Sequence, residues 1–351
     1  MRIHKQFIGG NIRVVSEEGN TVFLENELRD TVGDWFYWAF CVEEAAGRTV
    51  TFRFGPTRLG PFGPAVSRDL VHWQWLDQAD GDSFTYTFCD DAPVYFAHNM
   101  VYPVSRFDIL CEKHGWTKEI FCISKRGREV PCITVGSGEK KILLTARHHA
   151  CESTGSYVLE GVLDALSSRL TEDFSILCVP FVDYDGVLDG DQGKNRTPYD
   201  HNRDYAFDTE AVHPTCAALR RFIDTENIVL AFDFHSPYHR GGANDHCFIV
   251  QKNFGRLSRM NRFGEILAGS MRDDAFLYEK AWDHAPDVTW NMDATPTVVY
   301  RVLHRDTADL AFSLETAYFG TENNRFTAER GVETGHCFAE AMLAYIRERG
   351  L

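Results

Sequence analysis

The chain lacks any long hydrophobic segment. No apolar run approaches the roughly 18 residues that a helix needs to cross a bilayer, and the first seven residues, MRIHKQF, have no apolar core of the kind found in signal peptides. The ten cysteines are scattered and include no CxxC pair. We therefore expect a cytoplasmic protein with reduced cysteines and without attachment to a membrane.

Positive charge is scarce as well. Lys and Arg number 36 against 51 Asp and Glu, which gives a formal net charge of −15. This excess of negative charge argues against binding to nucleic acid or to an anionic membrane. The sequence also has no internal repeat, low-complexity segment or long linker. A chain of 351 residues can bury one large core or two modest ones, and the composition leaves open whether it forms a homo-oligomer.

Residues 1–102 are predicted to form an antiparallel β-sandwich domain. Short stretches rich in aromatic and β-branched residues are separated by Gly, Pro and Asp, a pattern typical of strands and turns. The strands are expected at residues 21–24, 35–42, 49–54 and 83–88. This part of the chain carries no recognisable set of catalytic residues.

Residues 103–351 are predicted to form an α/β domain, with the boundary near Tyr102 and Pro103. Apolar runs predict buried strands at residues 142–146, 175–179, 228–234 and 311–314. Helices are predicted over residues 153–170, 214–224, 254–271 and 332–349. The first helix has one apolar face because apolar residues recur every four positions, at Val158, Val162, Leu166 and Leu170. Strands that alternate with helices predict a mixed, mostly parallel sheet with helices on both faces.

Metal-binding residue types follow two of the predicted strands. His149 and Glu152 lie three residues apart after the strand at 142–146, and His235 closes the strand at 228–234. In an open α/β sheet, ligands bind beyond the carboxyl ends of the strands. Two histidines and one glutamate form a zinc ligand set that leaves one position for water, which zinc turns into a nucleophile. We therefore expect one Zn²⁺ per chain and a hydrolytic reaction.

Two residues within this motif and five arginines need a separate interpretation. His148 is the weaker ligand candidate because His149, and not His148, has the three-residue spacing to Glu152. Cys151 is expected to be a small buried residue behind the metal, since a thiolate ligand there would compete sterically with Glu152. Arginines stand out against the acidic background and would select an anion if they converge, namely Arg147, Arg196, Arg203, Arg301 and Arg305.

Five sequence elements resemble, in the same order, those of the zinc carboxypeptidases, and specifically the cytosolic carboxypeptidase branch. RHHACE at 147–152 is similar to the family's HxxE element, DYDGV at 183–187 to its Asn-Pro-Asp-Gly-Val turn, and DHNR at 200–203 to its Asp-x-Asn-Arg element. FDFH at 232–235 and SLET at 313–316 resemble the strands that carry the third ligand and the catalytic glutamate. The N-terminal part also resembles the β domain of this branch, as in a bacterial two-domain member.

The resemblance implies a zinc-dependent metallocarboxypeptidase that hydrolyses the C-terminal residue of a peptide or protein. It implies that His149, Glu152 and His235 bind zinc and that Glu315 is the general base. The resemblance also implies residues that bind the substrate. Arg196, with Lys194 as the alternative, would bind the oxyanion, and Asn202 and Arg203 would bind the terminal carboxylate. Tyr300, the nearest tyrosine upstream of Glu315, would cap the substrate, and Arg301, with His304 and Arg305, would line a side-chain pocket that prefers acidic residues.

Other functions stay open at this point. Non-haem iron oxygenases also use two histidines and a carboxylate, but they have no need of Glu315 or of an Asn-Arg clamp. A zinc amidohydrolase that deacylates a small N-acyl amino acid would need no long N-terminal β domain. A non-catalytic module that binds a carboxylate or a peptide would need no base beside the metal.

Overall fold

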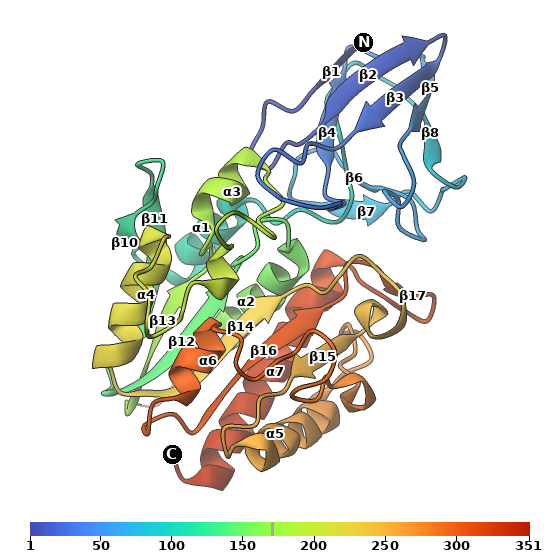
Figure 1. Ribbon diagram of the computed structural model, residues 1–351. Coiled ribbons are helices and arrows are strands. Elements are labelled where there is room, and N and C mark those ends of the chain that lie inside the picture. Colours follow the sequence, from blue (N-terminus) through green and yellow to red (C-terminus); the bar gives the residue numbers. More distant parts are fainter. Residues whose placement is uncertain (170–171) are drawn as a thin grey trace.

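The computed structural model describes residues 1–169 and 172–351. The N-terminal part contains two β-sheets (Figure 1). One sheet has the strand order β1-β4-β9-β6-β7, with β1 (Arg2–His4), β4 (Ala39–Glu43), β6 (Ala65–Ser67), β7 (Trp73–Trp75) and β9 (Val94–Ala97). The other has the order β2-β3-β5-β8, with β2 (Arg13–Glu18), β3 (Thr21–Glu25), β5 (Thr49–Arg53) and β8 (Ser83–Thr87).

An aromatic core lies between these two sheets. Phe40 of β4 contacts Phe96 of β9 and Phe52 of β5, with ring centroids 5.3 and 5.2 Å apart. Buried residues of β3, β4, β5, β8 and β9 belong to this core, whereas all six residues of β2 are exposed. Among the described strand pairs of this part, β3 and β5 run parallel and the others antiparallel. The prediction of an antiparallel sandwich is therefore corrected at this one pair.

The predicted strand at 35–42 forms only in its second half. The backbone of Tyr37 does not join a strand, because its N–H donates to Oε1 of Gln192 at 3.0 Å and its carbonyl accepts from Nε2 of the same side chain at 2.8 Å. These bonds to a residue 155 positions away replace the sheet ladder. The strands predicted at 21–24, 49–54 and 83–88 are confirmed as β3, β5 and β8.

In the described residues after 103, seven strands form one mixed sheet in the order β10-β11-β13-β12-β14-β16-β15. The pairs β12–β13, β12–β14 and β14–β16 are parallel, and antiparallel strands flank them. The strands are β10 (Glu119–Ile123), β11 (Glu129–Gly136), β12 (Lys140–Ala146), β13 (Phe174–Val179), β14 (Ile228–His235), β15 (Cys247–Val250) and β16 (Leu310–Thr316). A separate hairpin consists of β17 (Gly320–Thr321) and β18 (Asn324–Arg325).

Helices cover both faces of this sheet (Figure 1). They are α1 (Val104–His114), α2 (Ser153–Leu166), α3 (Tyr184–Asp189), α4 (Pro214–Thr225), α5 (Leu257–Ser270), α6 (Val298–Leu303) and α7 (Ala328–Arg349), with 3₁₀ turns at His201–Arg203, Gly242–Asp245 and Lys280–Trp282. On one face α7 packs against α2 and α5, and on the other α4 packs against α6. Phe232 of β14 contacts Phe263 of α5 and Phe338 of α7. Because side chains alternate along a strand, Asp233 and His235 lie on the α6 side.

The predicted helices agree with α2, α4, α5 and α7 to within a few residues at each end. Leu170, the last residue of the apolar face predicted for the first helix, lies outside the described residues. The turn expected at 183–187 is helical, because the carboxylate of Asp183 caps α3 by accepting from the N–H of Gly186 at 3.1 Å.

The two parts of the chain share one network of buried side chains. Trp75 of β7, for example, contacts Phe319 with ring centroids 5.5 Å apart, and its indole N–H donates to the carbonyl of Phe326. The division into domains at 102 and 103 stays a prediction. Among the described residues, no helix has the length and apolar character needed to span a membrane.

Candidate metal and catalytic site

His149, Glu152 and His235 converge at the carboxyl ends of β12 and β14. The Glu152 carboxylate lies between the imidazoles, with Oε1 2.8 Å from Nδ1 of His149 and Oε2 2.6 Å from Nδ1 of His235. One ligand atom from each residue lies within 4.8 Å of the others, and all three residues are buried. These are the three residues that the sequence suggests as zinc ligands, and their binding of zinc stays a prediction.

A close approach between α2 and β14 brings Glu152 beside His235. A Cβ atom on Gly155 would lie 2.8 Å from the backbone carbon of Phe234, so a larger residue would push the first turn of α2 away from the strand. Arg147 stabilises the turn before α2, because its guanidinium donates hydrogen bonds to the carbonyls of Ala150 and Tyr102. The sequence thus fixes the position of Glu152 through one glycine and one buried arginine.

Carboxylates hold the far side of each imidazole. Nε2 of His235 lies 2.6 Å from Oδ2 of Asp233, and Nε2 of His149 lies 3.6 Å from Oδ1 of Asp200. Such outer carboxylates fix the orientation and tautomer of metal-binding histidines. Sequence analysis missed the role of Asp233, although its two-residue spacing from His235 on one strand places both side chains on the same face.

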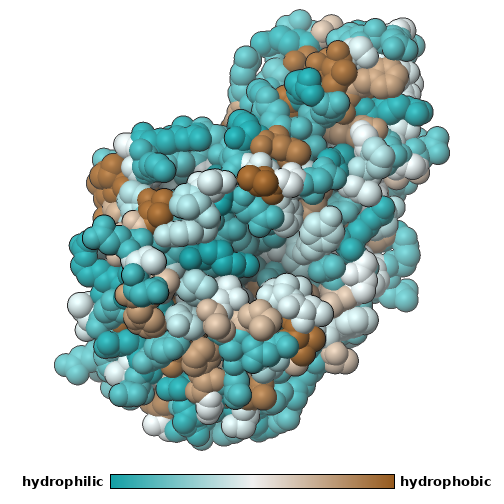
Figure 2. Space-filling model, in the orientation of Figure 1, coloured by the Kyte–Doolittle hydropathy of each residue, from teal (hydrophilic) through white to brown (hydrophobic). Residues whose placement is uncertain are grey.

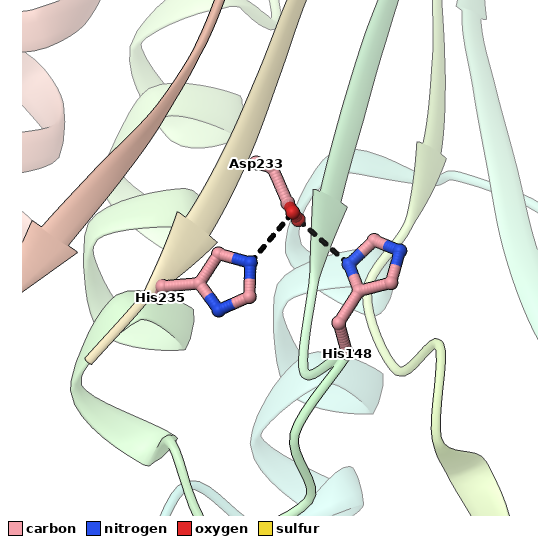
Figure 3. Close-up of side chains that lie close together, drawn as sticks. All are labelled: His148, Asp233 and His235. Atoms are coloured by element: carbon pink, nitrogen blue, oxygen red, sulfur yellow. Dashed lines mark hydrogen bonds and ion pairs between the residues drawn. The ribbon is translucent and has the colours of Figure 1, made fainter. Parts of the chain in front are cut away.

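His148, Asp233 and His235 form a second possible metal group (Figure 3). Both nitrogens of His148 are already engaged, Nδ1 with Oδ1 of Asp233 at 2.8 Å and Nε2 with the hydroxyl of Tyr205 at 2.7 Å. The His148 side chain is fully buried, so a metal in this group would have no open position for a substrate. This arrangement agrees with the interpretation of His148 as a residue that does not bind the metal.

The charges around the three residues favour a cation. Burial alone would raise the pKa of Glu152, but His149, Lys194 and His235 together hold the pKa of this carboxyl well below its usual range. Burial would lower the pKa of His235, but the carboxylates of Asp233 and Glu152 raise the pKa of this imidazole well above its ordinary value. Two carboxylates thus flank His235 and stabilise positive charge at this place.

His149 and Glu152 line a cavity of roughly 360 Å³, and His235 lines a recess beside it. Figure 2 shows a hollow with mostly hydrophilic residues around it between the N-terminal part and the rest of the molecule. Glu315 lines the cavity, since it lies directly beside His235 in the register of β14 and β16. Burial raises the pKa of Glu315 to about 7, and its Oε2 has no hydrogen-bond partner. Other residues of the cavity wall are Trp35, Lys194, Asn202, Arg203, Tyr238 and Trp290.

Asn202 and Arg203 lie in the 3₁₀ turn at His201–Arg203 and line the cavity with Glu315. The Oδ1 atom of Asn202 is buried without a hydrogen-bond partner, and Arg203 is half-buried. A recess next to the cavity is lined by Asn202, Arg203 and Glu315 and also by Lys252. Lys252 is buried, and its Nζ donates to the carbonyl of Met292 at 2.6 Å. Sequence analysis did not single out Lys252, which is 63 positions before Glu315 in the chain.

Arg196 does not reach this cavity. Its guanidinium pairs with three carboxylates, at 3.1 Å from Asp30, 2.7 Å from Asp183 and 3.1 Å from Asp191. Lys194, the alternative considered from the sequence, does reach it, with Nζ 2.5 Å from Oε1 of Glu152. Lys194, and not Arg196, therefore places a positive charge beside Glu152 in the cavity wall.

Arg301 and Tyr300 are also placed away from the cavity. The Arg301 guanidinium pairs with Asp224 and donates to the carbonyls of Tyr205 and Ala206. Tyr300 is half-buried. Its ring centroid lies 4.3 Å from that of His304 and 5.9 Å from that of Phe207. Both residues belong to α6, a helix not evident from the sequence, which turns them toward α4 and residues 205–207. The prediction that they line the substrate pocket is thereby corrected.

Comparison with known proteins adds independent information. No protein-family model matches the chain. The chain is 27% identical over 257 residues to Uncharacterized protein ZMO1242 of Zymomonas mobilis, covering 67% of each protein. It is 23% identical over 321 residues to cytosolic carboxypeptidase 2 of Xenopus tropicalis, covering 79% of this chain but 32% of that protein. The crystal structure of a metallo-carboxypeptidase from Burkholderia cenocepacia superimposes with a TM-score of 0.80 at 19% identity, covering 99% of both chains.

The chain is thus similar in sequence to a cytosolic carboxypeptidase over 79% of its length and has the fold of the Burkholderia metallo-carboxypeptidase. The fold shared with the Burkholderia metallo-carboxypeptidase extends over the N-terminal sheets as well as the α/β part. His149 and Glu152 of the HxxE element lie close enough to His235 to hold a metal ion together. The cytosolic carboxypeptidase 2 of Xenopus is about three times as long as the matched segment, so the chain corresponds to only part of that protein.

Proposed function

We propose that this protein is a zinc-dependent metallocarboxypeptidase, which removes the C-terminal residue of a peptide or protein. One observation carries the proposal. His149 and Glu152 of the possible metal-binding group line one cavity together with Glu315, Asn202 and Arg203, and His235, the third member of the group, lines the adjoining recess with the same Glu315, Asn202 and Arg203. Hydrolysis by an exopeptidase needs a metal site, a general base and a carboxylate-binding pair and little else.

The residues present fit a zinc ion. Two imidazole nitrogens and one carboxylate match the His₂Glu set of catalytic zinc sites, and both imidazoles have carboxylates at their outer nitrogens. Glu152 is oriented toward both histidines, and the cavity leaves one side of the group open. Zinc bound here would polarise the scissile carbonyl and lower the pKa of water.

Arg203 and Asn202 would bind the substrate's terminal carboxylate. A guanidinium can grip both oxygens of a carboxylate at once, which makes cleavage specific for a chain end. Arg203 has an Nη1 contact of 3.1 Å to the carbonyl of Asn202 and no carboxylate partner among the described residues. Unlike Arg196 and Arg301, it is therefore available for an anionic ligand.

Glu315 would act as the general base. Its raised pKa suits a group that takes a proton from the attacking water and passes it to the leaving amine. Lys194 would stabilise the negative charge that develops on the carbonyl oxygen, because its ammonium lies in the cavity wall beside Glu152.

A preference for acidic C-terminal residues would depend on Lys252 rather than on Arg301. Lys252 lines the recess beyond Glu315, where the side chain of the leaving residue would fit. Replacing Lys252 with Met is expected to lower kcat/KM for peptides ending in Glu by about tenfold or more, with little change for peptides ending in Leu, because a charge-assisted hydrogen bond contributes about 1.5–3 kcal/mol. The measurement is the ratio of kcat/KM for matched peptides, with the exposed Lys125→Met as control. Equal loss for both peptides would contradict this assignment.

The proposal is tested with the zinc-loaded protein and a mixture of peptides ending in acidic, basic, aromatic and aliphatic residues. Mass spectrometry should show loss of single C-terminal residues. Cleavage restricted to Glu or Asp would support the acidic preference, and cleavage of another class would keep the reaction but discard that preference. Absence of any cleavage, together with release of acetate from N-acetyl amino acids, would replace the proposal by a zinc amidohydrolase.

A further inference from the structure

A loop at residues 190–196 carries Lys194, and a segment of the N-terminal part at residues 27–37 binds this loop along its length. The segment connects β3 and β4 and is more than 150 positions from the loop in sequence. The contacts between the two are hydrogen bonds, ion pairs and one cation–aromatic contact. These contacts place part of the segment at residues 27–37 in the wall of the cavity.

Asp30 makes the central contacts. Its Oδ1 accepts from the N–H of Gln192 at 3.0 Å, and its Oδ2 accepts from the N–H of Gly193 at 2.8 Å. Oδ2 also pairs with Nε of Arg196 at 3.1 Å. The Asp30 side chain is only 7% exposed. One carboxylate thus binds the backbone on the N-terminal side of Lys194 and a side chain on its C-terminal side.

Neighbouring residues of the segment extend this grip. The hydroxyl of Thr31 donates to the carbonyl of Lys194, and the N–H of Val32 donates to the carbonyl of Asn195 at 3.2 Å. The carbonyl of Lys194 and the amides before it are therefore all held by the N-terminal part. In the other direction, the side chain of Gln192 in the loop forms hydrogen bonds with the N–H and the carbonyl of Tyr37 in the segment.

The loop needs external support because its backbone is unusual. Gly193 has φ +75°, and a Cβ atom there would lie 2.1 Å from the backbone nitrogen of Ala150. Asn195 has φ +48°, in the left-handed region that few residues adopt. Trp35 covers the loop's functional side chain, since Nζ of Lys194 lies 4.9 Å from the centroid of its ring. Trp35 and Lys194 both line the cavity with Glu315.

We infer that the N-terminal part completes the catalytic cavity: Asp30 is a positioning residue that holds Lys194 in place, and Trp35 is the wall that confines the Lys194 ammonium. The N-terminal sheets are then a component of the active site as well as a scaffold. This inference rests on the proposed role of Lys194, and its test includes a measurement that does not depend on catalysis.

The kinetic test is a double-mutant cycle with Asp30→Asn and Lys194→Ala, each measured with zinc bound and a cleaved peptide. Asp30→Asn alone is expected to lower kcat by about tenfold or more with KM nearly unchanged, because a misplaced group costs transition-state stabilisation. In the Lys194→Ala background, Asp30→Asn should lower kcat by less than about twofold. An equal loss of kcat in both backgrounds would mean that Asp30 acts on the fold in general and would overturn the inference.

The second measurement is chemical labelling of lysines by reductive methylation, followed by peptide mass spectrometry of the folded protein. Lys194 is 7% exposed and should label slowly. Asp30→Asn and Trp35→Ala should each accelerate labelling of Lys194 several-fold, while Asp34→Asn, which replaces a side chain that is 70% exposed, should not. Unchanged labelling in the first two variants would overturn the inference. Accelerated labelling in a protein that cleaves no peptide would uphold the positioning of Lys194 and reject the proposed function alone.

Discussion

Glu315→Gln is expected to lower kcat for peptide hydrolysis by about 10²–10⁴-fold while the zinc content stays at one ion per chain. Glutamine keeps the size and shape of the side chain but accepts no proton from water. The buried carboxyl of Glu315 has a raised pKa and an oxygen without a hydrogen-bond partner, which leaves it free to exchange a proton in the cavity. Steady-state kinetics and metal analysis of the same preparation measure both quantities.

A matched control is Glu322→Gln, which changes an exposed glutamate in the turn between β17 and β18 and should leave kcat unchanged. Thermal unfolding should show both variants folded. If Glu315→Gln retained more than about a tenth of the wild-type kcat with full zinc occupancy, Glu315 would not be the general base. If the variant lost zinc, its carboxylate would be part of the metal site instead.

His235→Ala is expected to abolish both zinc binding and hydrolysis, and Asp233→Asn is expected to weaken zinc binding by roughly 10–100-fold. His235 would supply one of three ligand atoms, whereas Asp233 would act only through the far nitrogen of that imidazole. Affinity is measured by competition with a chromophoric chelator. Removing zinc from the wild-type protein with a chelator should abolish hydrolysis, and adding zinc should restore it.

The control for these variants is His72→Ala, a histidine whose side chain is 81% exposed. It should bind zinc with wild-type affinity. Equal loss of affinity in Asp233→Asn and His235→Ala would indicate that Asp233 is itself a ligand, as in the second group with His148. Wild-type activity after complete removal of zinc would contradict the metal-dependent mechanism.

The α/β part was largely predictable because its signals are local. The apolar runs that became β12, β13, β14 and β16 and the four-residue repeat in α2 identify themselves within a few residues. His149, Glu152 and His235 could be singled out because each follows a buried strand, and such strand ends meet at one edge of a parallel sheet. Segments shaped by distant contacts were not predictable in this way, as shown by the backbone of Tyr37, which bonds to the side chain of Gln192 and not to a neighbouring strand.

The sequence indicates that positively charged residues lie near the site, but it does not show which arginines or lysines they are. An arginine and a lysine near a motif look alike in sequence, and the choice among them depends on which carboxylates lie close in space. Arg196 is neutralised by three aspartates and Arg301 by Asp224, whereas Lys194 and Lys252 remain in the cavity walls. Asp30 was missed for the same reason, since the amides that it binds are 162 and 163 residues away.

Anomalous X-ray scattering at the zinc edge from crystals of the zinc-loaded protein would locate the metal directly. We expect one strong peak per chain about 2.0–2.1 Å from Nδ1 of His149 and Nδ1 of His235, beside the carboxylate of Glu152 and open to the cavity of Glu315. A peak among His148, Asp233 and His235, or no ordered peak at full zinc loading, would contradict this expectation.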